Sequence, residues 1–254
     1  MRGALTVFLL LLFISAPAWA QAPSAWAAYE SGAYGEAARA GEARGDAEGL
    51  ALAARARLAE GVIDPRTMTD DELDRAAADA QQAIALDPDA VDARLSLAVA
   101  LGMKGRRVSL AEAWRRGYAQ KGRRLIGEAL KRDPDNARAQ AMLGAWHLEV
   151  IRRAGLTGAM FLGARVERGV AAFDAARKAA PDDPAIALHY AIALLALDPR
   201  KHAGEARDLL AAAAASTPRD AFETATREEA RRLGAVLATA GALAAAQLVS
   251  DRYM

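Results

Sequence analysis

The sequence predicts an all-α protein built as an array of helical hairpins, and three observations support this fold class. Ala and Leu are abundant and runs of β-branched residues are almost absent, which disfavours a sheet. The pattern of a helix end, a Pro turn and a helix start recurs in three segments of similar composition. These segments are AIALDPDAVDARLSLA, ALKRDPDNARAQAMLG and ARKAAPDDPAIALHYA, which begin at Ala83, Ala129 and Ala176. Whole columns of residues also agree when the copies are aligned on their prolines.

The aligned columns assign small and large residues to fixed positions around Pro88, Pro134, Pro181 and a degenerate fourth copy at Pro218. Counted back from each proline, the fifth residue is Ala, the eighth is apolar and the twelfth is small: Ala83, Ala129, Ala176 and Ala213; Ala80, Ile126, Phe173 and Leu210; Ala76, Gly122, Gly169 and Ala206. After the first three prolines, the ninth residue is large and the tenth is small: Leu97, Leu143 and Tyr190; Ala98, Gly144 and Ala191. Small residues let paired helices approach closely while large neighbours fill the adjacent space.

This set of columns resembles the tetratricopeptide repeat, a helix-turn-helix unit of about 34 residues. The resemblance covers residues 22–215 and is clearest over 76–197. Successive prolines are 46 (134−88), 47 (181−134) and 37 (218−181) residues apart, so the first two units carry insertions of about a dozen residues. LGAWHLEV beside a basic stretch also resembles the regulator-of-microtubule-dynamics group of these repeats. The resemblance implies a right-handed superhelical solenoid with two long inserted segments.

Residues 1–20 have the pattern of a secretory signal peptide. Arg2 is followed by an apolar run and then by Ala18-Trp19-Ala20, which predicts cleavage after Ala20 and a periplasmic protein. An uncleaved anchor is the alternative. The chain has no Cys, so disulfides cannot stabilise it after export. Nucleic acid is not expected as a partner at an exported address.

The remaining chain divides into a repeat domain, 21–218, and C-terminal capping helices, 219–254, because the columns fail after Pro218. Thr69 and Glu72 have capping-box spacing, so a helix should begin near Asp70. We expect repeat helices at 24–31, 34–44, 46–60, 70–86, 90–104, 109–132, 136–153, 163–179, 184–197 and 203–215. The last capping helix is expected from Gly234 to Ser250, uncharged but short and Ala-rich for a membrane span.

Charge is unevenly distributed, with eight acids between Asp70 and Asp92 and ten bases between Lys104 and Arg132. One interpretation is that neighbouring helices attract each other through solvated faces. The other is that the first insertion presents a basic surface to an anionic component of the envelope, and its candidate residues are Arg115, Arg116, Lys121, Arg123 and Arg124.

The second insertion, residues 154–166, is apolar and interrupted by glycines, without a clear helical period. It is expected to be a packed connection between helices. The alternative is that Leu156, Met160, Phe161 and Leu162 stay partly exposed and dock on a partner or a membrane surface.

No pattern of catalytic or metal-ligating residues is found. The sequence lacks Cys, a G-x-S-x-G elbow, phosphate-binding glycine motifs and H-E-x-x-H, so we expect no enzyme activity, cofactor or metal. His147 and His189 differ by five residues in their offset from the preceding proline, which separates them around equivalent helices. His147 is expected to be a residue of a helix surface or edge.

The resemblance implies that first helices of successive units line an inner groove. The lining positions are the fourth, seventh and eleventh residues after each proline: Asp92, Leu95 and Val99; Arg138, Ala141 and Ala145; Ala185, Leu188 and Ile192. Only Arg138 matches the basic clamp of family members that bind a terminal carboxylate. The sequence therefore predicts a non-enzymatic scaffold that binds a protein partner's peptide or helix. A groove filled by the inserted helices, and a peripheral membrane-associating protein using 104–132 and 154–166, remain as alternatives.

Overall fold

The computed structural model describes residues 24–253, and within that range every regular element is a helix. The predicted signal peptide lies outside the described residues. The α-helices are α1 (Ala25–Glu30), α2 (Tyr34–Arg44), α3 (Ala47–Ile63), α4 (Asp70–Leu86), α5 (Val91–Arg106), α6 (Leu110–Arg115), α7 (Tyr118–Arg132), α8 (Ala137–Leu162), α9 (Val166–Ala179), α10 (Pro184–Leu197), α11 (Pro199–Ala215), α12 (Ala221–Thr239) and α13 (Gly241–Tyr253). A 3-10 helix, η2 (Pro65–Thr67), follows α3, and the predicted capping box of Thr69 and Glu72 begins α4.

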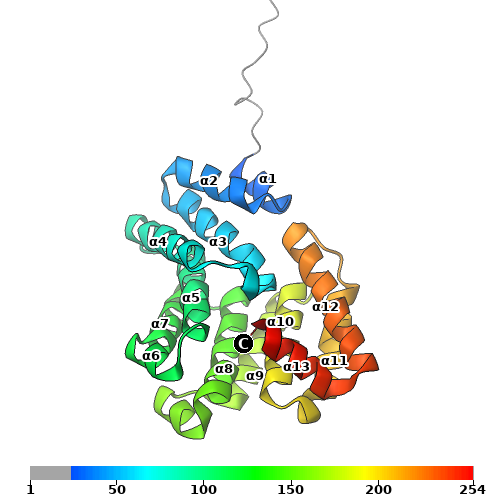
Figure 1. Ribbon diagram of the computed structural model, residues 1–254. Coiled ribbons are helices and arrows are strands. Elements are labelled where there is room, and N and C mark those ends of the chain that lie inside the picture. The colour runs from blue at the N-terminus through cyan, green and yellow to red at the C-terminus, as the bar shows by residue number, and fades with distance from the viewer. Residues whose placement is uncertain (1–23, 254) are drawn as a thin grey trace, which may run out of the picture.

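Neighbouring helices pack as antiparallel hairpins, which confirms the predicted helical solenoid. We call α3, α5, α8, α10 and α12 the inner helices, because they follow one another along one face of the array. Contacts link α3 to α5, α8 to α10, and α10 to α12, while α4, α7, α9 and α11 pack behind them. Figure 1 shows this succession curving from α3 through α5 and α8 to α10 and α12.

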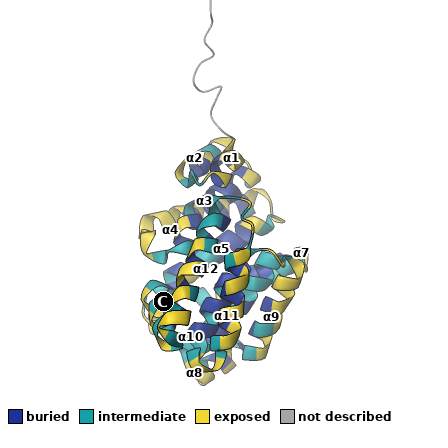
Figure 2. Ribbon diagram, turned by 90° about the vertical axis from the view of Figure 1, so that its right-hand side faces the viewer, coloured by how far each residue is buried: buried dark blue, intermediate teal, exposed yellow. Residues whose placement is uncertain are grey.

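The repeat columns lie between the helices, as the sequence predicts. All twelve residues of the three columns before the prolines are buried, and the four alanines of the −5 column are at most 1% exposed. Figure 2 shows buried residues along the faces where helices meet and exposed residues along the outer faces. Of the large residues after the prolines, Leu97 and Tyr190 are buried and Leu143 is half-buried.

The α8/α9 hairpin shows why one column must be small. A Cβ atom on Gly144 would lie 2.5 Å from a ring carbon of Phe173, and one on Gly169 would lie 2.8 Å from a methyl group of Leu148. The glycines therefore let the two backbones approach, and Phe173 stacks on Tyr190 of α10 with ring centroids 4.4 Å apart.

The C-terminal helices close the array onto its first helices. Helix α12 contacts α1 and α3, and α13 contacts η2. Arg252 of α13 pairs with Asp64, 3.2 Å away, and with Glu229 of α12, 3.4 Å away. The Tyr253 hydroxyl donates to Glu229 at 2.9 Å. These helices thus join both ends of the array, in addition to following its last repeat.

Both insertions differ from the expected helix boundaries. The single helix expected over 109–132 is divided into α6 and α7, because Gly117 has a left-handed backbone with φ of 66°. The packed connection expected over 154–166 is helical up to Leu162, since α8 continues beyond a kink at Gly155. The second insertion lacks a clear helical period in the sequence because glycines interrupt its apolar pattern, and α8 nevertheless resumes beyond the kink.

The C-terminal boundaries differ too. Helix α11 begins at Pro199 instead of residue 203, since Asp198 caps it by accepting from the Lys201 N–H at 3.1 Å. The final helix begins at Gly241 instead of Gly234, because residues 234–239 continue α12. The uncharged run is therefore shared between two helices. Among the described residues, no helix combines the length and the apolar character needed to cross a membrane.

The acidic and basic stretches pair with each other across α4, α5 and α7. Asp74 pairs with Lys104 and Asp70 with Arg107, while Asp89 accepts from Arg132 at 2.8 Å. The carboxylates are largely exposed, so each pair contributes little to stability, about 0–1 kcal/mol. The acidic and basic stretches therefore attract each other across neighbouring helices, as the first interpretation of the charge pattern expects.

Candidate functional site

A cavity of about 850 Å³ lies on the inner side of the array and is the candidate binding site. Its walls come mainly from the inner helices α3, α5, α8, α10 and α12, with further residues from α6 and α7. The volume is within the range of about 300–1,000 Å³ found for small-ligand sites. The inserted helices contribute to one wall and leave the space hollow.

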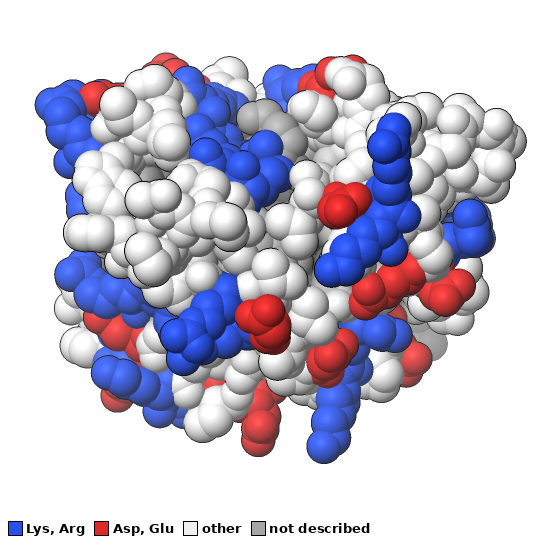
Figure 3. Space-filling view, turned by 90° about the horizontal axis from the view of Figure 1, so that it is seen from below, with Lys and Arg blue, Asp and Glu red and all other residues white. Residues whose placement is uncertain are grey.

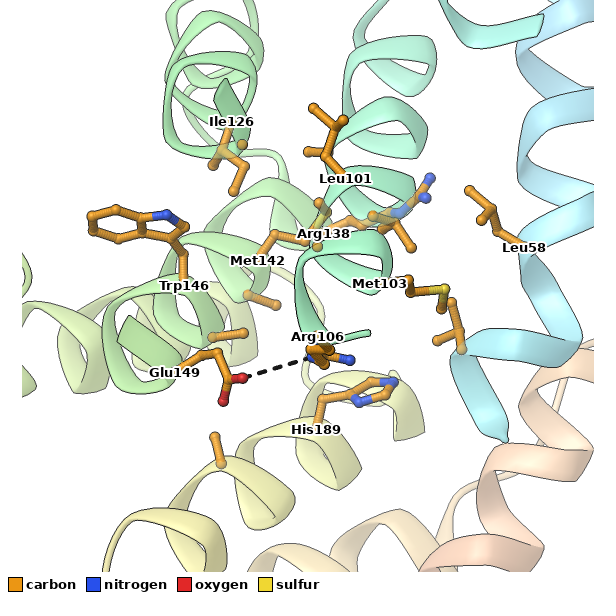
Figure 4. A pocket seen from close by; sticks show the side chains of 18 of the residues that line it. Leu58, Leu101, Met103, Arg106, Ile126, Arg138, Met142, Trp146, Glu149 and His189 are labelled. Carbon is orange, nitrogen blue, oxygen red and sulfur yellow. Dashed lines mark ion pairs between the residues drawn. The ribbon is translucent and has the colours of Figure 1, made fainter. Parts of the chain in front are cut away.

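The middle of the cavity is apolar. Figure 4 shows Trp146 and Ile126 on one side and Leu58 and Met103 on the other, with Met142 between them. The Trp146 indole N–H donates to the Ala119 carbonyl at 2.8 Å, which fixes the ring against the wall. The centre of the cavity therefore presents apolar surface to a ligand, because the indole N–H of Trp146 already has a hydrogen-bond partner.

The cavity wall carries a partly satisfied cationic group. Arg138 of α8 has one guanidinium nitrogen 3.5 Å from Asp92 of α5, and that buried nitrogen has no hydrogen-bond partner. Burial and the neighbouring Arg55 lower the pKa of Arg138. Arg55 donates to the Tyr29 hydroxyl at 3.2 Å and lies over the Tyr29 ring. Arg138 is therefore the group here with hydrogen-bonding capacity left for a ligand.

Charged residues also gather at a second place in the wall. Arg106 of α5 lies 3.8 Å from Glu149 of α8, and Arg152 pairs with the same carboxylate at 2.8 Å. His189 of α10 points toward this group (Figure 4). Its burial and the nearby Arg106 lower the pKa of His189 to about 4, so the imidazole is neutral at pH 7 and can accept or donate one hydrogen bond.

The structure places most of the predicted groove positions around this cavity. Seven line it: Asp92, Val99, Arg138, Ala141, Ala145, Ala185 and Ile192. Leu95 and Leu188 are 0% and 1% exposed and lie in the hydrophobic core. Leu95 packs with Ala129 and Ala139 between hairpins, because its side chain turns toward the outer helices.

Several lining residues were not identified from the sequence: Leu58, Leu101, Met103, Arg106, Ile126, Met142, Trp146, Glu149 and His189. Three of these residues lie on the same helical face as a predicted groove position. Met142 and Glu149 lie four and eleven residues after Arg138, and His189 lies four residues after Ala185. Extending each inner face by helical periodicity would have identified these three. Leu58 and Ile126 come from other repeats and have no such signal.

The residues of the predicted basic surface differ in their surroundings. Arg115 and Arg116 both pair with Glu112, and Arg124 lies 3.8 Å from Glu128. Lys121 is exposed. Arg123 is half-buried over the Trp146 ring, 5.7 Å from its centroid, and its burial together with Arg168 lowers its pKa.

His147 is buried, so its expected position at a helix surface was wrong. It is 2% exposed, and its Nδ1 accepts from the Arg165 backbone N–H at 3.3 Å. It is buried because α9 covers this face of α8 at Gly169, a contact that helix-wheel reasoning on α8 alone does not contain. Burial, followed by Arg123 and Arg168, lowers the pKa of His147 to about 4.

Within residues 24–253, no group of three or more His, Asp or Glu side chains is arranged to hold a metal ion.

Comparison with known proteins supports the fold. No family model matches the sequence, and no curated protein matches it. Among solved structures, the chain is similar to a thermophilic TPR protein of Thermus thermophilus, with a TM-score of 0.56 and 19% sequence identity. The match covers 79% of this chain and 92% of that chain. Together with the buried repeat columns, this similarity shows that the chain has the fold of a tetratricopeptide-like helical repeat protein.

Proposed function

We propose that this chain is a non-enzymatic interaction protein of the cell envelope, exported by residues 1–20, whose inner cavity binds a short segment of a partner protein. The observation that carries the proposal is the apolar cavity of about 850 Å³ formed by successive inner helices. Helical repeat proteins expose such inner surfaces for binding. An apolar peptide segment or one face of a short helix supplies the matching chemistry.

The charged groups of the wall favour a partner with a polar or anionic group next to its apolar part. Arg138 has an unsatisfied buried nitrogen, and a partner's carbonyl or carboxylate oxygen would satisfy it. The apolar residues between Arg138 and the Arg106–Glu149 pair would then cover the partner's side chains (Figure 4). The closed array limits the segment's length, because α12 and α13 connect both ends of the ring.

Photo-crosslinking tests the proposal. A photoreactive amino acid replaces Ala145, which lines the cavity, and in a matched control it replaces Ala175, which is exposed on α9 of the same hairpin. Crosslinking in the cell envelope should give a discrete protein adduct from position 145 alone. Equal adducts from both positions, or none from position 145, would contradict a partner in the cavity.

The crosslinked segment then serves as a synthetic peptide in calorimetry. Ala141→Trp fills the cavity and should weaken binding of that peptide by roughly tenfold or more, since a Trp side chain occupies space that the ligand needs. Ala175→Trp should bind the peptide like the parent protein. Unchanged affinity of Ala141→Trp would place the peptide elsewhere on the molecule.

A further inference from the structure

The most exposed large apolar side chains gather at one end of the molecule, beside Leu110 and Trp114, which also line the cavity. Leu156, Met160 and Phe161 of α8 are 84%, 79% and 77% exposed, more than any other large apolar residue among those the structure describes. Leu110 and Trp114 of α6 are exposed as well. The Trp114 and Phe161 rings lie 5.2 Å apart, which joins α6 to the end of α8. We call these five residues the apolar tip.

The apolar tip is held in place by the fold. Beyond the kink at Gly155, Ala159 is 3% exposed and packs with Val150 and Ala164. The Ala164 N–H donates to the Ala159 carbonyl at 2.8 Å, so the chain turns back sharply after the tip. One side of this helical end is therefore anchored while the large apolar side chains project outward. Such a contiguous patch is unfavourable in water and indicates an interaction site.

Exposed arginines flank the apolar tip in the sequence. Arg115 and Arg116 end α6, with side chains 74% and 53% exposed, and they share the single carboxylate of Glu112. Arg165 and Arg168 follow the tip and are exposed, and Arg168 is close enough to Arg123 to influence its pKa.

The arginines outnumber the acids around the tip. Glu112 and Glu167 are the acidic residues next to these four arginines in the sequence, so the two segments that flank the tip carry an excess of two positive charges. Figure 3 shows this end of the molecule from below, with a broad area of uncharged atoms and several Lys and Arg side chains along its margin. Elsewhere, Lys104, Arg107 and Arg132 each pair with a carboxylate of their own.

This combination fits the surface of a bilayer better than a protein partner. Leu, Met, Phe and Trp side chains exposed at the end of a helix can enter the boundary between headgroups and acyl chains without a complementary pocket. Trp side chains favour this boundary, and Arg side chains attract anionic headgroups. We propose that the apolar tip docks this protein reversibly on a bilayer containing anionic lipid, with Met160 and Phe161 inserted and the flanking arginines at the level of the phosphates.

Vesicle binding tests the docking surface. The protein is purified in the form that the cell exports and its N-terminus is verified, so that every variant carries the same N-terminal residues. It should sediment with vesicles of phosphatidylethanolamine and phosphatidylglycerol, less with phosphatidylcholine vesicles, and less again as the salt concentration rises. Absence of sedimentation with the anionic vesicles at low salt would overturn the proposal.

Two matched double variants test whether vesicle binding depends on the tip or on exposed apolar residues in general. Met160→Ser with Phe161→Ser should lower the partition coefficient by roughly tenfold or more, because two apolar side chains no longer insert. Leu86→Ser with Leu243→Ser also removes two exposed apolar residues, 55% and 57% exposed, and should bind vesicles like the parent. All four positions are exposed, so circular dichroism should show unchanged folding. An unchanged partition coefficient of the tip variant would overturn the proposal.

Two further readouts identify what covers the tip. Brominated lipid should quench Trp fluorescence of the parent, and Trp114→Phe should lose most of that quenching while Trp26 and Trp146 remain. A parent dimer that Met160→Ser with Phe161→Ser converts to monomer, without vesicle binding by either, would show that a second copy covers the tip instead of lipid. Ala141→Trp should leave vesicle binding unchanged, which distinguishes this surface from the cavity.

Discussion

At the scale of single residues, the fold depends on glycines at positions where two helices pack too closely for a side chain. Gly144 and Gly169 stand where α8 and α9 meet, and any larger residue would collide with Phe173 or Leu148. Gly204, by contrast, is exposed on α11 with no atom within 4 Å of a Cβ built on it. The same residue type therefore has opposite consequences at these two helical positions.

Gly144→Ala should lower the free energy of unfolding by about 1–3 kcal/mol, because overpacking outweighs the gain in helix propensity. The control Gly204→Ala should raise it by about 0.5–1 kcal/mol, since only the propensity changes. Urea denaturation measures both values. A stabilised Gly144→Ala protein would show that α8 and α9 do not approach as closely as described.

Buried His147 predicts a loss of stability in acid. Its pKa is lowered from 6.5 to about 4 in the folded protein, so between these values the unfolded chain binds the proton that the folded protein excludes. The free energy of unfolding therefore falls as the pH decreases from 6.5 toward 4, by about 2 kcal/mol at pH 5 from this residue alone.

His147→Asn removes this titration while keeping an acceptor near the Arg165 N–H. Its loss of stability between pH 7 and pH 5 should be smaller than that of the parent by about 2 kcal/mol. Urea denaturation at the two pH values measures the difference, and His189, whose pKa is also lowered, should maintain part of the parent's dependence. The same pH dependence in variant and parent would contradict the burial of a neutral His147.

At the scale of elements, α13 is joined to distant parts of the chain by ion pairs as well as by apolar contacts. Its Arg252 connects to Asp64 near η2 and to Glu229 on α12, with only 13% of the side chain exposed. Arg66 pairs with the same Asp64 at 2.8 Å, but it is 60% exposed and two residues away in the chain. Both arginines therefore pair with Asp64, but only Arg252 connects it to a distant helix.

Arg252→Gln should raise the hydrogen-exchange rates of α13 amides by roughly tenfold, because the tie between the two ends of the array is lost. Arg66→Gln should leave those rates nearly unchanged, since an exposed local pair contributes little. Hydrogen exchange followed by mass spectrometry distinguishes the helices. Equal exchange rates in the two variants would mean that the Arg252–Asp64 pair does not hold α13 in place.

At the scale of the whole molecule, the closed array depends on the approach of α12 to the turn after α1. Gly32 has φ of 85°, and a Cβ built there lies 2.9 Å from the Ala221 Cβ at the start of α12. Gly45 has φ of 68° and no atom within 4 Å of such a Cβ. Asn tolerates this backbone region better than other non-Gly residues, so it isolates the effect of contact.

Gly32→Asn should separate α12 from α1, lower the free energy of unfolding by about 1–3 kcal/mol and increase the radius of gyration. Gly45→Asn should have the same backbone cost without opening the array. Small-angle X-ray scattering and urea denaturation provide the two measurements. A Gly32→Asn protein with the compactness and stability of Gly45→Asn would contradict the closure.

The sequence by itself determined the repeating framework. The residues at −5, −8 and −12 from each proline predicted the buried faces, because close helix pairing accepts only small or well-fitted side chains there. The buried faces are local consequences of helical periodicity, which a linear pattern contains. The resemblance to the tetratricopeptide repeat, aligned on the same prolines, implied the lining positions Arg138, Ala141 and Ala145, and these residues line the cavity.

The tertiary structure alone decided what the repeats enclose. Closure of the array by α12 and α13, the burial of His147 under α9, and the meeting of Leu58 with Ile126 around one cavity all join segments far apart in the chain. Trp114 and Phe161 likewise come together from two insertions. Such contacts depend on the accumulated rotation from one hairpin to the next, a small angle that no single repeat's residues encode.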